Sequence, residues 1–171
     1  MVYPTDTLLG LGARARDRNA VARLIEAKGR SGAQAISVCV SSTEEVERYA
    51  EVSRAARRFV RRHLPGPYTV LLPPSALARR TLAPAVAGGP TIGLRVPDHP
   101  VARELARRAG PITATSANPH GAPPARTVAE ARRAFGKTVD LYLSPAPPVG
   151  GVPSTLVDLT GVAPRVVERR R

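Results

Sequence analysis

The sequence contains little cysteine, few aromatic residues and few acidic residues. Its single cysteine, Cys39, excludes an internal disulfide and a cysteine-based metal cluster. The three histidines, His63, His99 and His120, are scattered without the spacing of metal ligands. No apolar run approaches the roughly 20 residues that a membrane-spanning helix needs, and no signal peptide is recognisable at the start of the sequence. These absences predict a cytoplasmic protein with no structural metal and no membrane attachment.

Acidic residues are half as frequent as basic ones. The 26 Lys and Arg against 13 Asp and Glu give a formal net charge of +13 and a pI near 11.4. A surplus of this size attracts polyanions such as RNA, although an arginine-rich proteome would explain it too. With four Tyr, two Phe and no Trp, few rings can stack on bases, so RNA would be contacted mainly through its phosphates. One candidate surface is a predicted helix that carries Arg54, Arg57, Arg58, Arg61 and Arg62. A solvated arginine-rich face would explain the same pattern.

Helices are predicted by capping residues and by apolar residues at helical spacing. Asp17 can cap the first helix, and Gly29 can end it. Ser42 and Glu45 have the spacing of a capping box, which predicts one helix from residue 42 to about His63. The predicted helices cover residues 18–28, 42–63, 75–82, 100–110 and 127–136.

Runs rich in β-branched and aliphatic residues alternate with these helices. The predicted strands cover residues 36–40, 68–72, 91–96, 112–115, 139–143, 155–159 and 165–168. The last two are separated by a short Gly/Pro-containing loop and read as a hairpin. A chain of 171 residues is long enough for one sizeable core and too short for two comfortable domains. We therefore expect a single α/β domain over residues 1–171, with a mixed sheet and flanking helices.

Three loops carry small hydroxyl or amide side chains where a strand meets a loop. They are Thr5-Asp6-Thr7, Ser116-Ala117-Asn118 and Ser154-Thr155. Ligands of α/β proteins bind at such strand ends. Ordinary turn chemistry would explain each loop taken alone, so the sequence pattern by itself leaves both readings open.

Fixed cations accompany these loops. Arg95 lies inside an otherwise apolar strand, where a guanidinium needs a ligand carboxylate or phosphate, or an ion pair with Asp98 or Asp158. Lys28 and Arg30 lie at the end of a predicted helix and either bind an anion or complement the helix dipole. No nucleophile–base pair, Walker-type loop or GxGxxG fingerprint is recognisable in the sequence.

Six motifs follow one another along nearly the whole chain. They are Tyr3-Pro4-Thr5-Asp6-Thr7 with Gly10 and Gly12, Lys28-Gly29-Arg30, Pro65-Gly66-Pro67-Tyr68-Thr69, Arg95-Val96-Pro97, Ser116-Ala117-Asn118, and Ser154-Thr155-Leu156-Val157-Asp158. Together they resemble the YrdC-like family of threonylcarbamoyl-AMP synthases. The resemblance implies a single twisted α/β domain with a concave basic face.

The resemblance also implies an activity. A synthase of this family joins L-threonine, bicarbonate and ATP into threonylcarbamoyl-AMP and releases pyrophosphate. A partner transferase complex then moves the threonylcarbamoyl group to the adenosine next to the anticodon of certain tRNAs. Catalysis would depend on positioning and on neutralising phosphate charge, with Mg2+ expected and no covalent intermediate.

The family's binding residues map onto this sequence motif by motif. The resemblance implies that threonine is bound by Thr7, Arg95, Ser154 and Cys39, the last at a position where the family commonly has a histidine. It implies an ATP side that consists of Lys28, Arg30, Gln34, Thr91, Ser116 and Asn118. No metal ligand and no catalytic side chain beyond these binding residues is assigned.

The sequence departs from the family pattern in several places. Two prolines usual after Arg30 are absent, Gln34 replaces a frequent asparagine, and Leu8-Leu9 replaces the usual Val-Tyr. We also expect the family's usual N-terminal helix to be missing and no extra C-terminal domain to follow. These departures leave two alternatives open. One is a weakly active or inactive paralogue that binds RNA or nucleotide through its basic face. The other is carbamoyl transfer, as in hydrogenase-maturation carbamoyltransferases.

Overall fold

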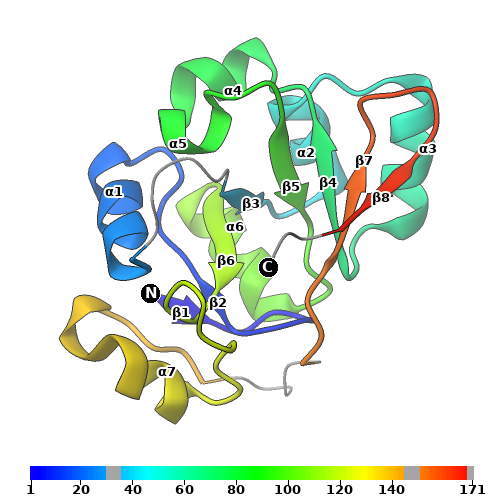
Figure 1. The fold of residues 1–171 in the computed structure, drawn as a ribbon. Helices are drawn as coiled ribbons and strands as arrows, with labels where there is room; N and C mark the ends of the chain where they lie inside the picture. The colour runs from blue at the N-terminus through cyan, green and yellow to red at the C-terminus, as the bar shows by residue number, and fades with distance from the viewer. Residues whose placement is uncertain (30–35, 145–150, 169–171) are drawn as a thin grey trace.

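A mixed β-sheet forms the centre of the molecule. The computed structural model describes residues 1–29, 36–144 and 151–168. Within them, eight strands form one twisted sheet in the order β1-β2-β6-β3-β5-β4-β7-β8 (Figure 1). The strands are β1 (Val2–Tyr3), β2 (Gly10–Leu11), β3 (Ser37–Cys39), β4 (Tyr68–Leu72), β5 (Ile92–Arg95), β6 (Ile112–Ser116), β7 (Thr155–Asp158) and β8 (Arg165–Val167).

The sheet contains two parallel and five antiparallel strand pairs among the described residues. β3 pairs with β5, and β4 with β7, in parallel, while the other neighbours are antiparallel. The predicted hairpin is confirmed, since β7 and β8 pair antiparallel with Asp158 opposite Arg165. The register also sets Cys39 beside Arg95. The predicted mixed α/β sheet is therefore confirmed, and its central strands lie where β-rich runs of the sequence predicted them.

Helices flank the sheet. They are α1 (Arg18–Ala27), α2 (Thr43–Tyr49), α3 (Arg54–His63), α4 (Ala76–Thr81), α5 (Pro84–Ala87), α6 (Pro100–Ala109) and α7 (Val128–Phe135), followed by a 3-10 turn, η1 (Gly136–Thr138). Figure 1 shows α1 and α7 near the β1–β2 end of the sheet and α3 toward the β7–β8 end. The Asp17 carboxylate accepts from the backbone N of Ala20 at 3.0 Å, which confirms the predicted cap of α1. Among the described residues, no helix is long and apolar enough to span a membrane.

Residues 42–63 form two helices, and the prediction of one continuous helix is wrong. The backbone of Ala50 is extended, with φ −135° and ψ 156°. The next residue, Glu51, donates its backbone N–H to the carbonyl of Pro73 at 2.8 Å, and Ser53 then caps α3. A backbone partner from a distant segment thus replaces the helical hydrogen bonds at this point.

Two smaller predictions are also wrong. Ser42 makes no side-chain cap of α2, and the Glu45 carboxylate accepts from the backbone N of Ser41 at 2.7 Å. Residues 139–143 form no strand; within them the structure has an isolated bridge to Val2. Because β1 is only two residues long, it offers too few backbone groups to extend a ladder at this edge of the sheet.

The close approach of Tyr3 explains two glycines of the first motif. The Tyr3 ring is fully buried, and its hydroxyl donates to the carbonyl of Thr113 at 3.1 Å. A Cβ atom on Gly10 would lie 2.8 Å from this ring, and one on Gly12 would lie 2.7 Å from it. Both glycines leave space for the ring, and the ring in turn forms part of the cavity described next.

Candidate functional site

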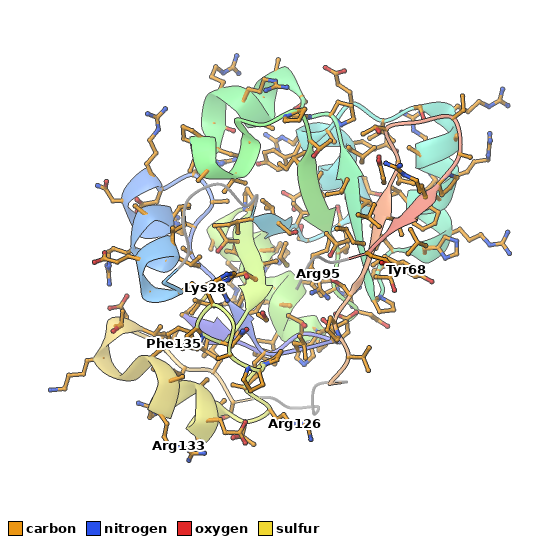
Figure 2. The ribbon with its side chains drawn as sticks, in the orientation of Figure 1. Lys28, Tyr68, Arg95, Arg126, Arg133 and Phe135 are labelled. Atoms are coloured by element: carbon orange, nitrogen blue, oxygen red, sulfur yellow. The ribbon has the colours of Figure 1, made fainter. Side chains whose placement is uncertain are left out.

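A cavity of about 230 Å³ opens where several strand ends meet. The three loops singled out in the sequence all contribute to its wall, as the strand-end argument predicted. Among the described residues, two cations line the cavity, and Figure 2 labels both: Lys28 at the end of α1 and Arg95 in β5. Of the candidate site residues, those that line the cavity are Thr7, Lys28, Arg95, Ser116, Asn118 and Ser154.

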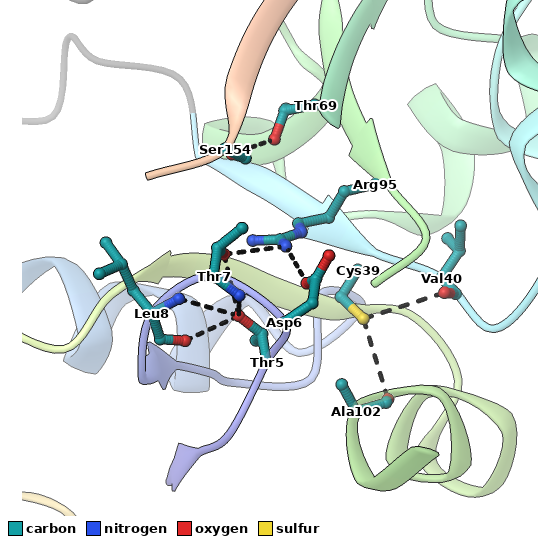
Figure 3. Close-up of polar contacts among 10 residues, drawn as sticks. All are labelled: Thr5, Asp6, Thr7, Leu8, Cys39, Val40, Thr69, Arg95, Ala102 and Ser154. Atoms are coloured by element: carbon teal, nitrogen blue, oxygen red, sulfur yellow. Dashed lines mark hydrogen bonds and ion pairs between the residues drawn. The ribbon is translucent and has the colours of Figure 1, made fainter. Parts of the chain in front are cut away.

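A hydroxyl network shapes the loop between β1 and β2. Thr5 Oγ1 donates to the carbonyl of Leu8 at 2.7 Å and accepts from the backbone N–H groups of Thr7 and Leu8. It also lies 3.0 Å from Thr7 Oγ1, and Figure 3 shows this arrangement. Both threonines are buried. Both interpretations that the sequence left open therefore apply to this loop. Thr5 makes the hydrogen bonds that form the turn, and Thr7 faces the cavity.

Arg95 is paired with Asp6, not with either carboxylate considered from the sequence. Arg95 Nη2 donates to Asp6 Oδ1 at 2.6 Å and to Thr7 Oγ1 at 3.1 Å (Figure 3). Asp98 lies 3.9 Å from Arg103 instead, and Asp158 bonds to Arg165. The predicted partners are therefore wrong, although the expectation that this guanidinium needs an anion is confirmed.

Lys28 connects α1 to the loop after β6. Its ammonium donates to the carbonyls of Ser116 and Asn118, each at 2.7 Å, and its own carbonyl accepts from the backbone N of His120 at 2.7 Å. The residue is buried. A buried ammonium is costly unless such partners surround it, so Lys28 orients the loop that carries Ser116 and Asn118 while also lining the cavity.

Polar side chains complete the other walls. Ser154 Oγ lies 2.8 Å from Thr69 Oγ1, and both side chains are buried in the cavity wall. The Asn118 amide Nδ2 donates to the carbonyl of Ala122 at 2.6 Å. Its Oδ1 is buried and has no hydrogen-bond partner among the described residues. This oxygen is therefore available to accept a hydrogen bond from a ligand.

Four of the candidate site residues are not among the residues that line the described cavity wall. Cys39 and Thr91 are not among the described residues that line the cavity. The Cys39 thiol points to the carbonyls of Val40 and Ala102, at 3.9 Å each (Figure 3). Thr91 precedes β5 at the opposite end of the strand from Arg95. Arg30 and Gln34 lie outside the described residues.

The burial of Cys39 has a chemical consequence. Desolvation raises the pKa of this thiol to about 12, against the opposing effect of the Arg95 charge. Only the thiolate reacts with alkylating reagents. We expect iodoacetamide at pH 8 to leave the native protein unmodified and to label it once in guanidinium chloride, as read by mass spectrometry. The variant Cys39→Ser should stay unlabelled in both states, and rapid labelling of the native protein would contradict this placement.

Several residues of the wall had no role assigned from the sequence. Tyr3, Thr5 and Thr69 belong to recognised motifs, so the motif itself was the available signal. His120 was set aside because a lone histidine has no ligand spacing, yet it lines the cavity next to Asn118. Within the described residues, no group of three or more His, Cys, Asp and Glu could hold a metal ion. The hydroxyl, amide and cationic side chains of the described wall can bind a polar or anionic ligand.

Comparisons with known proteins find a family whose model matches almost the whole chain. The family model Sua5/YciO/YrdC, whose description reads "Telomere recombination", matches residues 1–170. A protein of Mycobacterium tuberculosis is 39% identical over 168 residues, which are 98% of this chain and 76% of the relative. A protein of Chromohalobacter salexigens named threonylcarbamoyl-AMP synthase is 38% identical over 164 residues, 93% of this chain and 85% of the relative.

A solved structure shares the fold. The crystal structure of P. abyssi Sua5 complexed with L-threonine superposes with a TM-score of 0.86 at 32% sequence identity. The match covers 98% of this chain and 49% of the Sua5 chain, so this chain spans about half of that protein. Because the family model matches residues 1–170 and each of the six motifs contributes a residue to the cavity wall, this chain belongs to the Sua5/YciO/YrdC family.

Proposed function

We propose that this protein is a threonylcarbamoyl-AMP synthase, which forms threonylcarbamoyl-AMP and pyrophosphate from L-threonine, bicarbonate and ATP. The observation that carries the proposal is the buried guanidinium of Arg95 beside Thr7 in a cavity that also holds Lys28. Such a wall suits a ligand with one carboxylate and several hydrogen-bonding groups. The names of relatives in the same family, such as the Chromohalobacter salexigens protein, support the assignment.

The threonine end of the cavity is formed by Arg95, Thr7 and Ser154. Arg95 receives the carboxylate of the amino acid, because a guanidinium binds a carboxylate through charge-assisted hydrogen bonds. The hydroxyls of Thr7 and Ser154 both donate and accept, which suits the amine and the hydroxyl of threonine. Thr69, at 2.8 Å from Ser154, sets the orientation of that hydroxyl. A threonine-bound Sua5 from P. abyssi supports this reading.

The ATP end is formed by Lys28, Ser116 and Asn118. Lys28 supplies positive charge, and the buried Asn118 Oδ1 accepts from an N–H or O–H group of the nucleotide. The resemblance adds Arg30 and Gln34, which lie outside the described residues. Thr91 and Cys39 do not contribute to the described wall, so we assign neither of them a direct contact.

The reaction requires positioning more than a reactive side chain. The threonine amine attacks carbon of bicarbonate to give a carbamate, with loss of water. A carbamate oxygen then attacks the α-phosphorus of ATP, and pyrophosphate leaves with the bonding electron pair. Mg2+ enters with ATP, because phosphate oxygens are ligands that Mg2+ prefers. The Lys28 charge offsets the negative charge of the phosphates, while Arg95 holds the carboxylate of the amino acid.

One assay separates this synthase from a weakly active or inactive paralogue that binds RNA or nucleotide. The protein is incubated with ATP, Mg2+, bicarbonate and labelled L-threonine, and threonylcarbamoyl-AMP is followed by chromatography. We expect pyrophosphate release that requires threonine and bicarbonate together. Absence of product from protein shown to be folded by circular dichroism would favour the paralogue.

A role in tRNA modification implies further partners. We propose that a transferase complex in the cytoplasm takes up the product and that the positive charge of this protein attracts tRNA. The exposed arginines of α3 form the candidate surface, and Glu47 pairs with two of them, Arg57 and Arg61. Since such contacts are made with phosphates, affinity for a tRNA measured by filter binding should fall steeply between 50 and 200 mM salt. Affinity independent of salt would contradict this mode of binding.

A further inference from the structure

Asp6 places a carboxylate directly beside the cavity. Its Oδ1 lies 2.6 Å from Arg95 Nη2, and the two side chains are 13% and 8% exposed. Within the described residues, Asp6 is the one carboxylate that pairs with this guanidinium. Asp6 therefore neutralises Arg95 before a ligand arrives, although Arg95 was the residue expected to attract the ligand.

The pair still has unused hydrogen-bonding capacity. Asp6 Oδ2 and Arg95 Nε are buried and have no partner among the described residues. A buried ion pair whose only task is structural is stable when its remaining donors and acceptors are bonded as well. Unbonded groups of this kind call for a specific explanation. An ion pair whose unbonded donor and acceptor contact a ligand provides one.

The two proposed substrates create a selection problem in this cavity. Its described wall contains the cations Lys28 and Arg95 but no acidic side chain. L-Threonine carries one carboxylate and one ammonium group, whereas ATP and pyrophosphate carry several negative charges. Coulomb attraction grows with the charge of the ligand, so an unpaired Arg95 would bind phosphates in preference to an amino acid. The carboxylate of Asp6 repels a polyanion and attracts an ammonium group.

We infer that Asp6 is a positioning and specificity residue of this site. It orients the Arg95 guanidinium toward the carboxylate of the amino acid and keeps the phosphates of ATP and pyrophosphate away from it. The identity of the amino acid rests on the proposed function. The exclusion of polyanions depends only on the pairing of Asp6 with Arg95.

The test compares the wild type with Asp6→Asn, which keeps the shape of the side chain and removes its charge. We expect the KM for threonine to rise about tenfold, with a smaller change in kcat. We also expect inorganic pyrophosphate to become a competitive inhibitor with respect to threonine. Asp6→Glu restores the charge and should restore the wild-type inhibition pattern. Asp17→Asn is the matched control, since it makes the same charge change at an exposed cap where asparagine serves equally well.

The outcomes separate the inference from the proposed function. A purely structural Asp6 would lower thermal stability and activity without changing which ligand competes with threonine. A folded Asp6→Asn variant with wild-type KM and wild-type inhibition would overturn the inference. If the wild type forms no threonylcarbamoyl-AMP, calorimetric titration with pyrophosphate decides: tighter binding to Asp6→Asn than to wild type supports the inference although the proposed function fails, and equal binding refutes it.

Discussion

The variant Arg95→Ala is expected to lose about 10²–10³-fold in kcat/KM for L-threonine, because it removes one partner of a buried charged contact. The same change leaves the Asp6 carboxylate without its partner at 2.6 Å. The free energy of unfolding should therefore fall as well, by about 3 kcal/mol. Initial rates of pyrophosphate release at varied threonine concentration, together with thermal unfolding, measure the two effects separately.

Two control variants test whether the loss of activity is specific to the Arg95 guanidinium. Arg95→Lys keeps the charge but lacks the guanidinium, whose Nη2 donates to both Asp6 and Thr7 and whose other nitrogens remain for a ligand carboxylate, so an intermediate loss is expected. Arg103→Ala removes a partly exposed arginine that lies 3.9 Å from Asp98, and its rates should match the wild type. Threonine-dependent activity that persists in folded Arg95→Ala would show that the carboxylate is bound elsewhere.

The variant Lys28→Met is expected to damage both the fold and the ATP side of the cavity. It removes the donor that bonds the carbonyls of Ser116 and Asn118 at 2.7 Å. Burying carbonyls without a donor costs about 1–3 kcal/mol for each group. In a protein of this size, each kcal/mol lowers the melting temperature by about 2–4 °C. The loop that carries Asn118 should also lose its position, so the KM for ATP should rise more than the KM for threonine.

Lys137→Met provides the matched control for this variant. Lys137 is the same residue type on the exposed 3-10 turn after α7, so its replacement should change neither the melting temperature nor either KM. Steady-state kinetics with ATP and threonine varied in turn, and calorimetric unfolding, provide the comparison. Equal melting temperatures for Lys28→Met and the wild type would mean that the two carbonyl contacts contribute little to stability.

Local signals predicted much of the fold. Asp17 and the apolar spacing behind it placed the first helix within one residue of its observed end, over Arg18–Ala27. The β-rich run over 68–72 coincides with β4. By contrast, β1 and β2 have two residues each. Segments of this length are too short to show a periodic pattern of apolar residues. The predicted helix over 42–63 failed because its interruption depends on a carbonyl of Pro73, which sequence spacing does not reveal.

The candidate site, too, was predicted from the sequence only in part. The order of the motifs predicted that Thr7, Ser116 and Ser154 would share one site, and the cavity wall contains all three. The sequence did not predict which carboxylate balances the positive charge of Arg95. Asp98 is three residues away and was a natural partner, yet the observed partner is Asp6, 89 residues away in sequence.

The sequence by itself thus determined the family, most helices and strands, and the residue types at the cavity. These features depend on neighbouring residues or on motifs that are visible without a fold. The tertiary structure alone decided that Asp6 neutralises Arg95, that Lys28 bonds two carbonyls of the loop after β6, and that Cys39 faces Ala102 outside the cavity. Each of these depends on how strands, helices and loops pack together, which brings residues far apart in sequence to within hydrogen-bonding distance.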